Sequence, residues 1–420
     1  MPSGKTYMCF DLKSFFASVE CVERGLDPFT TNLVVADPSR GERTICLAAT
    51  PAIKALGAKS RGRVYEIPKG IDYIMAEPHM SLYIDYSSRI YNIYLRYAAP
   101  EDIHVYSIDE IFMDATAYMG ARSLTPREFA RKVMADVFNE TGITATCGIG
   151  ENIYLAKIAL DVISKRSPEF IGELTEESYR EQLWDHLPLT DFWRISTGTV
   201  KRLSRIGIRT LRELAHADEA VLFKTFGVDA RLLIDHAWGR ENVTIADIKA
   251  YKPKSRSLST GQVLHAGSDE ATARLLMLEM AELLSLDLVK NGVAAGSVEL
   301  MLGYSFSADV PPVHSSMQLD TPTSSTKKLM ECVGALYDRV AVQKCDVFRL
   351  NLSFGRLVNE TSVQYDIFTD TAAQEKEKRL QHTLIGIKDK YGKNGIFKGM
   401  DLLKGATTLE RNAQIGGHKA

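Results

Sequence analysis

The stretch HVYSIDEIFMDAT, residues 104–116, places two acids side by side in a segment that otherwise has the apolar pattern of a buried strand. Neighbouring side chains on a strand point to opposite faces, so at least one of Asp109 and Glu110 would point into the core. Burying a carboxylate without a partner is strongly unfavourable, unless its pKa rises so far that the group is protonated and neutral. Either the segment is an exposed hairpin tip, or the strand breaks at a turn where both acids face a cation.

Length and composition describe a globular protein of more than one domain. The 420 residues are 45% hydrophobic and 25% charged, and a chain of this length is expected to form roughly two to four domains. A net charge of −2 means that any nucleic-acid site must be a local basic patch. The six cysteines show no CxxC spacing and sit mostly in apolar segments, which predicts reduced core thiols in a cytoplasmic protein. No signal peptide or membrane-length apolar run is present, so no membrane association is expected.

The order of elements predicts two α+β units with helices between them. With residues 26–80 set aside as a small inserted subdomain, the chain up to residue 165 reads strand, helix, strand, strand, helix, strand, which is the order of a ferredoxin-like sheet. Residues 257–355 repeat this order, and residues 166–245 are predicted to be all-helical. The fold class is therefore multidomain α+β.

A third acid, Asp11, ends the first strand of the first unit. In a ferredoxin-like sheet this strand lies beside the strand that carries Asp109 and Glu110, so three carboxylates would meet at one edge. Alone, Asp11 would read as a helix N-cap. Three clustered acids repel one another unless divalent cations neutralise them, and carboxylate oxygens favour magnesium or manganese. Two such ions serve an in-line phosphoryl displacement.

Three motifs in order along the chain are CFDLKSFFASVE (9–20), YSIDEIFMD (106–114) and GIGENIYLAKIA (148–159). They resemble the Y-family translesion DNA polymerases, most closely the UmuC-like (ImpB/MucB/SamB) branch, and the resemblance spans roughly residues 5–410. It implies a right-hand polymerase with a palm (1–25 and 81–165), fingers (26–80), a helical thumb with a helix-hairpin-helix (166–245), a basic linker (246–256), a second ferredoxin-like unit called the little finger (257–355), and an extension (356–420) that carries a clamp-binding peptide and a mobile tail.

The resemblance also assigns roles around the acids. Asp11 and Asp109 would bridge two Mg²⁺ ions, for which Mn²⁺ can substitute. Glu110 would complete the site of the primer-side ion, and the Leu12 carbonyl would join the nucleotide-side ion. Phe16 stands where the family places a steric gate that excludes the 2′-hydroxyl of ribonucleotides.

Further residues are implied at the nucleotide. Phe15 belongs either to the gate pocket or to the helix core. Lys54 would hold the triphosphate, and Thr50 would take part of the role of a phosphate-binding tyrosine that this chain replaces by proline. Lys165 would be the second triphosphate cation, unless Ser164 occupies the matching position. Lys157 lies in the third motif and is either functional or structural.

Basic residues that predict DNA contacts gather in two places. The segment 197–215 resembles a helix-hairpin-helix, in which backbone N–H groups bind phosphates, and the linker adds a second patch. The expected contacts, which would be independent of base sequence, are Lys201, Arg202, Arg205, Gly207, Arg209, Lys252, Lys254 and Arg256. QYDIF resembles the peptide that bacterial proteins insert into the sliding clamp, with Gln364, Asp366, Ile367 and Phe368 as the contacts.

These features predict a DNA-templated DNA polymerase of low fidelity that copies damaged templates in the SOS response. It would act as a monomer on primer-template DNA and dNTP, bind the sliding clamp, and lack a proofreading exonuclease. Two alternatives stay open. A catalytically inert DNA-binding accessory protein would be expected to have lost one of the acids. A nucleotidyl cyclase on a similar palm would need neither the basic patches nor the clamp peptide.

Overall fold

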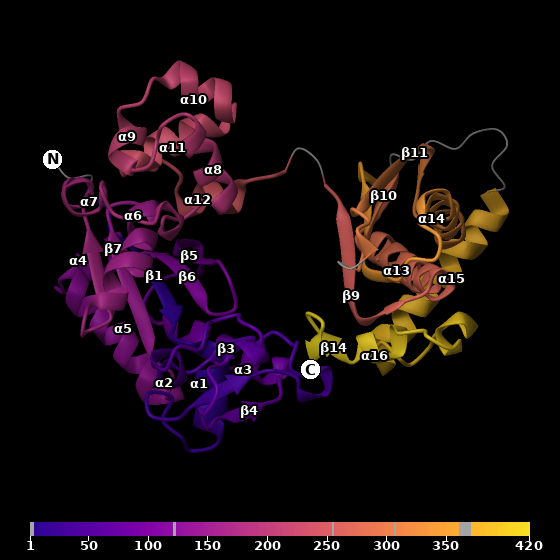
Figure 1. Cartoon of the computed structure of the whole chain (residues 1–420), viewed down its shortest axis with the longest axis horizontal. Helices are drawn as coiled ribbons and strands as arrows, with labels where there is room; N and C mark the ends of the chain where they lie inside the picture. The colour runs from indigo at the N-terminus through magenta and orange to yellow at the C-terminus, as the bar shows by residue number, and fades with distance from the viewer. Residues whose placement is uncertain (1–3, 121–122, 254–255, 306–307, 361–370) are drawn as a thin grey trace. The chain divides into compact units, whose positions relative to one another are not determined.

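The computed structural model describes residues 4–120, 123–253, 256–305, 308–360 and 371–420. The chain divides into two compact units, Met1–Tyr251 and Lys252–Ala420, whose elements are labelled in Figure 1. The predicted clamp peptide at residues 364–368 and Lys254 lie outside the described residues.

The first unit is organised around a five-stranded sheet. Its strands, in spatial order, are β5 (Ile103–Val105), β6 (Glu110–Asp114), β1 (Tyr7–Leu12), β7 (Ala145–Gly150) and β8 (Ile171–Leu174). The first four have the predicted strand and helix order, with β1 antiparallel to both of its neighbours. The fifth, β8, pairs parallel to β7 and falls in a region predicted to be all-helical, so that prediction was wrong there.

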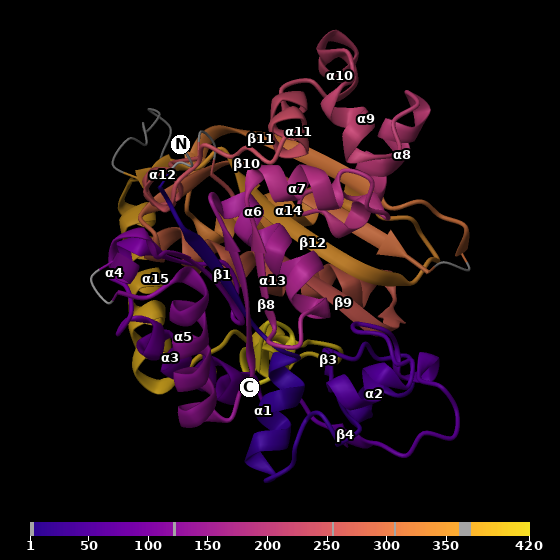
Figure 2. The same ribbon diagram turned by 90° about the vertical axis from the view of Figure 1, so that its left-hand side faces the viewer.

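Alternating side chains of this sheet separate its two faces. One face carries Phe10 and Met113 into a large apolar core beneath α1 (Phe15–Glu23), α3 (Met80–Tyr94) and α5 (Pro126–Thr141). Helices α3 and α5 lie side by side (Figure 2). The other face carries Cys9 and Phe112 against α6 (Ile153–Ile158). A short helix, α4 (Thr116–Gly120), follows β6.

The segment 26–80, predicted to be an inserted subdomain, contains an apolar cluster of its own. Its elements are β2 (Leu33–Val35), β3 (Ala48–Ala49), α2 (Pro51–Ala55) and β4 (Ile74–Ala76). The strand order is β3-β2-β4, with β2 and β4 parallel.

Helices dominate the rest of the first unit. They are α7 (Glu176–Leu183), α8 (Thr197–Arg205), α9 (Leu211–Ala215), α10 (Glu219–Phe226), α11 (Asp229–Ala237) and α12 (Ile245–Ala250). Helix α12 occupies about half of the predicted linker, and Ile245 packs with Phe112 against the five-stranded sheet of the first unit. The predicted linker is therefore helical up to residue 250, because an apolar residue anchors this helix.

The second unit repeats the order of elements but not the order of strands. Its elements are β9 (Leu258–Ser268), α13 (Glu270–Lys290), β10 (Val293–Tyr304), β11 (Val313–Thr323), α14 (Thr326–Val340) and β12 (Val347–Gly355), with β13 (Val358–Asn359) paired to β10. The sheet order is β11-β10-β12-β9. In the first unit the third strand lies between the first and the second, whereas here the fourth strand does. The prediction of a second ferredoxin-like unit is thus confirmed in element order and differs in sheet order.

The C-terminal segment is folded onto the second unit. It comprises α15 (Thr371–Tyr391), α16 (Thr408–Asn412) and a hairpin of β14 (Gln414–Ile415) and β15 (His418–Lys419). The fully buried Glu279 on α13 accepts hydrogen bonds from the backbone amides of Thr407 (3.0 Å) and Thr408 (3.2 Å). These contacts join the start of α16 to the long helix α13.

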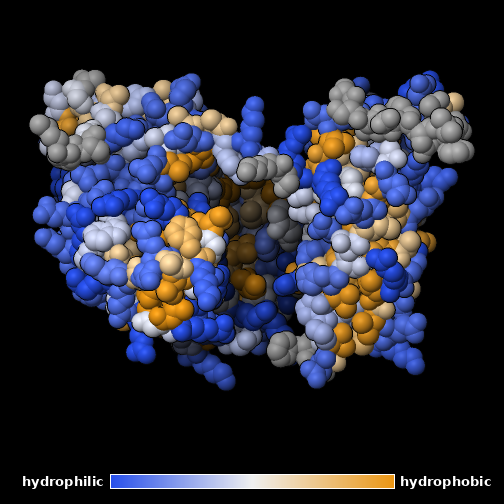
Figure 3. All heavy atoms as spheres, turned by 90° about the horizontal axis from the view of Figure 1, so that it is seen from above, coloured by the Kyte–Doolittle hydropathy of each residue, from blue (hydrophilic) through white to orange (hydrophobic). Residues whose placement is uncertain are grey.

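The surface and the cysteines of the structure have the character that the composition predicted for a globular protein with reduced thiols. Hydrophilic residues cover most of the visible face of each unit, with apolar residues in separate patches (Figure 3). In the described part of the chain, no helix has the length and apolar character needed to cross a membrane. All six cysteines are free thiols, and four of them are buried.

Candidate active site

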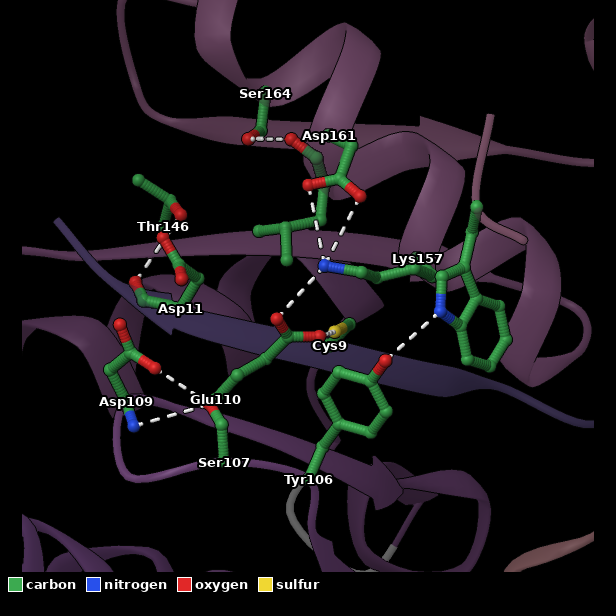
Figure 4. Close-up of polar contacts among 12 residues, drawn as sticks. Cys9, Asp11, Tyr106, Ser107, Asp109, Glu110, Thr146, Lys157, Asp161 and Ser164 are labelled. Carbon is green, nitrogen blue, oxygen red and sulfur yellow. Dashed lines mark hydrogen bonds and ion pairs between the residues drawn. The ribbon is translucent and has the colours of Figure 1, made fainter. Parts of the chain in front are cut away.

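Three acids meet at one end of β1 and β6, as the sequence predicted. Asp11 and Glu110 are directly opposite in the antiparallel ladder, so their side chains leave the same face of the sheet. Asp109 lies in the bend that precedes β6, and its carbonyl accepts the Leu12 amide at 2.9 Å. The strand therefore does break between the two neighbouring acids, which frees Asp109 from the strict alternation of a strand (Figure 4).

The negative charge of the Asp11 carboxylate is not fully compensated by its neighbours. Thr146 donates a hydrogen bond of 3.3 Å to the backbone carbonyl of Asp11, not to its carboxylate. Burial, and then the charges of Asp109 and Glu110, raise the pKa of the Asp11 carboxyl to about 7. A carboxylate in this position becomes favourable when positive charge is brought to it.

A buried lysine supplies part of that charge to Glu110. Lys157 on α6 donates to Glu110 Oε2 at 2.9 Å, and the thiol of Cys9 donates to Oε1 at 3.3 Å. Lys157 also lies 3.1 Å from a carboxylate oxygen of Asp161 (Figure 4). Burial lowers the pKa of the Lys157 ammonium, but the charges of its neighbours more than offset this and hold that pKa above its ordinary value. The sequence left the role of Lys157 open and missed Asp161.

Two glycines of the third motif bring this lysine to the acids. In β7, Cys147 and Ile149 face the apolar core, whereas Gly148 and Gly150 face α6. A Cβ at Gly148 would lie 2.1 Å from the carbonyl oxygen of Ala156, and one at Gly150 would lie 2.3 Å from the Ala156 amide. The helix backbone therefore packs directly on the strand, which only glycine permits.

The donor set fits a hard divalent cation in its chemistry. Three carboxylates and the Leu12 carbonyl offer the oxygen ligands that magnesium prefers. Within the described residues, however, no three His, Cys, Asp or Glu side chains converge as they would around an ion. In Figure 4 the Glu110 carboxylate is turned towards the ammonium of Lys157, which lies 2.9 Å from Oε2.

A group of lysines lies beside the acids. The pKa of Lys54 is lowered by burial and then by the charge of Lys13, with Lys165 contributing, and its ammonium donates to Ser14 Oγ at 2.8 Å. Lys13 has its pKa lowered by burial and lies 4.3 Å over the ring of Phe170. Sequence reasoning missed Lys13; its signal was the position two residues after Asp11. Like charges held together in this way suit a polyanion.

Three residues predicted at the nucleotide have other surroundings in the structure. The Thr50 hydroxyl is buried, donates to the Thr31 carbonyl at 2.7 Å and accepts the Leu33 amide, so it holds the inserted subdomain together. Phe15 is 3% exposed and belongs to the core. Ser164 is buried and donates to a carbonyl within its own helical turn, whereas the neighbouring Lys165 side chain is 65% exposed.

Phe16 differs from its neighbour Phe15. It is only partly buried, and its ring stacks on that of Tyr83 with centroids 4.4 Å apart and an interplanar angle of 14°. Part of the Phe16 ring therefore remains accessible near the start of α1, whereas the Phe15 ring is enclosed in the core.

The predicted helix-hairpin-helix is formed by α8 and α9 around Gly207, whose φ of 83° suits glycine. Its four amides from Gly207 to Thr210 are all engaged: the first two donate to carbonyls of α8, and the other two donate to Glu213 Oε2 at 2.6 and 3.2 Å. The backbone N–H groups are therefore occupied in this structure, and the side chains of the turn are the groups that face solvent.

The basic side chains divide by their contacts. Lys201, Arg205 and Arg209 are exposed. Arg202 donates to the Thr225 carbonyl and lies 4.3 Å over the ring of Phe226. In the connection between the units, Lys252 is exposed, and Arg256 donates to Asn359 at 3.1 Å.

Comparisons with known proteins show which family and which chains this chain resembles. The model of the impB/mucB/samB family matches residues 10–161, and the model of that family's C-terminal domain matches residues 255–367. The chain is 31% identical to "Putative UV-damage repair protein UvrX" of Bacillus subtilis (strain 168), over 99% of this chain and 98% of that one. It is 30% identical to "DNA polymerase IV 2" of the same organism over the full length of both. Among solved structures, "Y-family DNA polymerase chimera Dbh-Dpo4(243-245)-Dbh" is similar with a TM-score of 0.66 and 20% identity, over 84% of this chain and 99% of that chain.

Proposed function

The chain belongs to the impB/mucB/samB family and is a Y-family translesion DNA polymerase, and on that premise we propose that Asp11, Asp109 and Glu110 carry its nucleotidyl transfer. The observation that supports this most is the register of β1 and β6, which sets Asp11 opposite Glu110. In addition, the backbone carbonyl of Asp109 accepts a hydrogen bond from the amide of Leu12, the residue that follows Asp11. An inert accessory protein would have no use for three acids gathered at one strand end.

The acids and the Leu12 carbonyl would hold two magnesium ions, for which manganese can substitute. Bound there, the ions supply a Lewis acid for the triphosphate and for the primer 3′-hydroxyl. The protein contributes position and charge: Asp11 and Asp109 present oxygen ligands, and Lys157 holds the Glu110 side chain against the sheet. Template-directed addition then requires that the nucleotide lie between these acids and the inserted subdomain.

The incoming dNTP would be held by the lysine group. Lys54, Lys13 and Lys165 present ammonium groups next to the acids, and a triphosphate relieves their mutual repulsion. Lys13 compensates for the missing phosphate-binding tyrosine of the inserted subdomain. Phe16 would form the gate that excludes the ribose 2′-hydroxyl.

Primer-template DNA would lie along the exposed side chains Lys201, Arg205, Arg209 and Lys252, which bind phosphates without reading bases. The engaged amides of the hairpin around Gly207 favour side-chain over main-chain contacts. We further propose, on the sequence alone, that Gln364 to Phe368 binds the sliding clamp and that the protein acts in the cytoplasm as a monomer in the response to DNA damage.

Primer extension tests the proposal. The parent protein, with magnesium and all four dNTPs, should extend a labelled primer, including past an abasic site. Asp109→Ala should lose extension while retaining primer-template affinity, and Glu101→Ala, an exposed acid before the same hairpin, should extend normally. Extension by Asp109→Ala at the parental rate would refute the assignment of the acids. Replacing Gln364 and Phe368 by Ala should weaken clamp pull-down only; an equal loss of clamp-free synthesis would refute the clamp peptide.

A further inference from the structure

The proposed gate, Phe16, rests on a second aromatic ring. Tyr83 of α3 is fully buried, and the Phe16 ring stacks on it nearly parallel, at 4.4 Å between centroids. One face of Phe16 is therefore defined by Tyr83, and the position of the gate depends on the position of that ring.

Tyr83 is itself held at its hydroxyl. The phenol donates a hydrogen bond of 2.7 Å to Oε1 of Glu20, whose side chain is 1% exposed. Glu20 lies four residues after Phe16 on α1, so both side chains project from the same face of that helix. Tyr83 thus contacts the gate residue Phe16 through its ring and the carboxylate of Glu20 through its hydroxyl.

Glu20 is kept as a buried acceptor by two further donors. His79 Nδ1 lies 2.8 Å from Oε1, and the Arg24 guanidinium donates to Oε2. Burial raises the pKa of the Glu20 carboxyl, but the hydrogen bonds from His79, Tyr83 and Arg24 outweigh burial and lower it. A buried carboxylate that accepts three hydrogen bonds is a rigid anchor, because losing a donor leaves part of a buried charge uncompensated.

We propose that Glu20, acting through the Tyr83 hydroxyl, is a positioning residue for Phe16 and sets how strictly ribonucleotides are excluded. The inference rests on the proposed function, in which Phe16 is the sugar gate. Repulsion between atoms in contact is steep, so a small displacement of the ring opens room for a 2′-hydroxyl while the deoxyribose is still bound.

The chain contains a matched control one helical turn away. Tyr86, also on α3, donates through its hydroxyl to Glu23 of α1 at 2.6 Å. The same two helices are joined by the same kind of bond. The face of the Tyr86 ring, however, is covered by the Arg89 guanidinium at 4.8 Å. Removing the Tyr86 hydroxyl tests whether any weakening of the α1–α3 contact is enough to change discrimination.

The experiment is single-nucleotide insertion of dNTP and of the matching rNTP opposite one template base. The ratio of the two kcat/KM values is measured for the parent and for Tyr83→Phe, Glu20→Ala, Glu20→Gln, Tyr86→Phe and Phe16→Ala. Thermal unfolding is recorded for each variant. We expect Tyr83→Phe and Glu20→Ala to raise relative ribonucleotide use by about tenfold, in line with the effect of small changes in pocket shape. Glu20→Gln keeps an acceptor oxygen and should fall closer to the parent, and Tyr86→Phe should stay within about twofold of it.

The outcomes distinguish the proposed positioning role of Glu20 from the alternatives. If Phe16→Ala relaxes discrimination but Tyr83→Phe leaves the parental ratio, the gate stands and the positioning role of Glu20 is refuted. If Phe16→Ala itself changes nothing, the proposed gate fails, and this inference fails with it. If Tyr86→Phe relaxes discrimination as much as Tyr83→Phe, general loosening between α1 and α3 is the cause, and the inference is refuted. Tyr83→Phe removes one oxygen only, so the test holds even if Glu20→Ala does not fold.

Discussion

Nζ of Lys157 lies 2.9 Å from Oε2 of Glu110, and each of the two side chains is only 9% exposed. This is an ion pair shielded from solvent at the edge of the three-acid cluster. Removing one partner of such a pair leaves an uncompensated buried charge, which is more harmful than replacing both partners.

Lys157→Met should therefore lower the free energy of unfolding of the first unit by about 3 kcal/mol. Adding Glu110→Gln should recover part of the loss, because the unpaired carboxylate disappears. All three tryptophans, Trp184, Trp193 and Trp238, lie in the first unit, so urea unfolding followed by tryptophan fluorescence reports that unit alone. The exposed pair Arg96–Glu140 is the control, and Arg96→Met should cost less than about 1 kcal/mol. If the effects of Lys157→Met and Glu110→Gln on the free energy of unfolding were strictly additive, the two side chains would not be coupled and the prediction would be wrong.

Gly148→Ala should damage the same site through the backbone. The added Cβ would lie 2.1 Å from the carbonyl oxygen of Ala156, so α6 must move away from β7 and carry Lys157 with it. We expect a loss of stability of about 2 kcal/mol and a fall in kcat for dNTP insertion. Gly120→Ala, where a Cβ meets nothing within 4 Å, should change neither. Parental kcat and stability in Gly148→Ala would show that this close packing is dispensable.

The sequence could predict the acids because their type and spacing carry the chemistry directly. The surroundings of the acids depend on contacts between distant segments, which local patterns do not encode. Lys157 and Asp161 join the cluster only because α6 packs against glycines of β7, and Thr50 is turned inward by the Thr31 carbonyl and the Leu33 amide. Reading such contacts requires the positions of both partners.

The prediction of the fold was limited in the same way, because the order of strands depends on contacts between distant segments. Both α+β units have the predicted order of elements, yet their sheets differ, because one order of elements is compatible with more than one order of strands. Strand β8 has only four residues, too few to show a period, and it forms because the edge of β7 is available to it. The amides of Thr407 and Thr408 bind the buried Glu279, which lies 128 and 129 residues earlier in the chain, and a local pattern cannot show such a contact.

Lys54→Ala and Lys13→Ala should each raise KM for dNTP by about tenfold, as expected when one charge-assisted hydrogen bond to a phosphate is removed. The effect on kcat should be smaller, because neither lysine is proposed to touch the reacting hydroxyl. Lys59→Ala, an exposed lysine of the same inserted subdomain, serves as the control and should leave KM unchanged. Steady-state insertion kinetics on one primer-template measure all three. A parental KM in Lys13→Ala would remove it from the nucleotide site.

Lys201→Ala combined with Arg205→Ala should weaken primer-template binding equally for all sequences. The two residues are four apart on α8, so they share one exposed face of that helix and can bind neighbouring phosphates. The slope of log affinity against log salt should become shallower by about 0.9 for each phosphate that the variant no longer neutralises. Arg212→Ala is the control: its guanidinium is held by Asp185 at 2.6 Å, so its removal should change the slope less. Fluorescence anisotropy across a salt series gives both quantities, and an unchanged slope in the double variant would place the DNA on another surface.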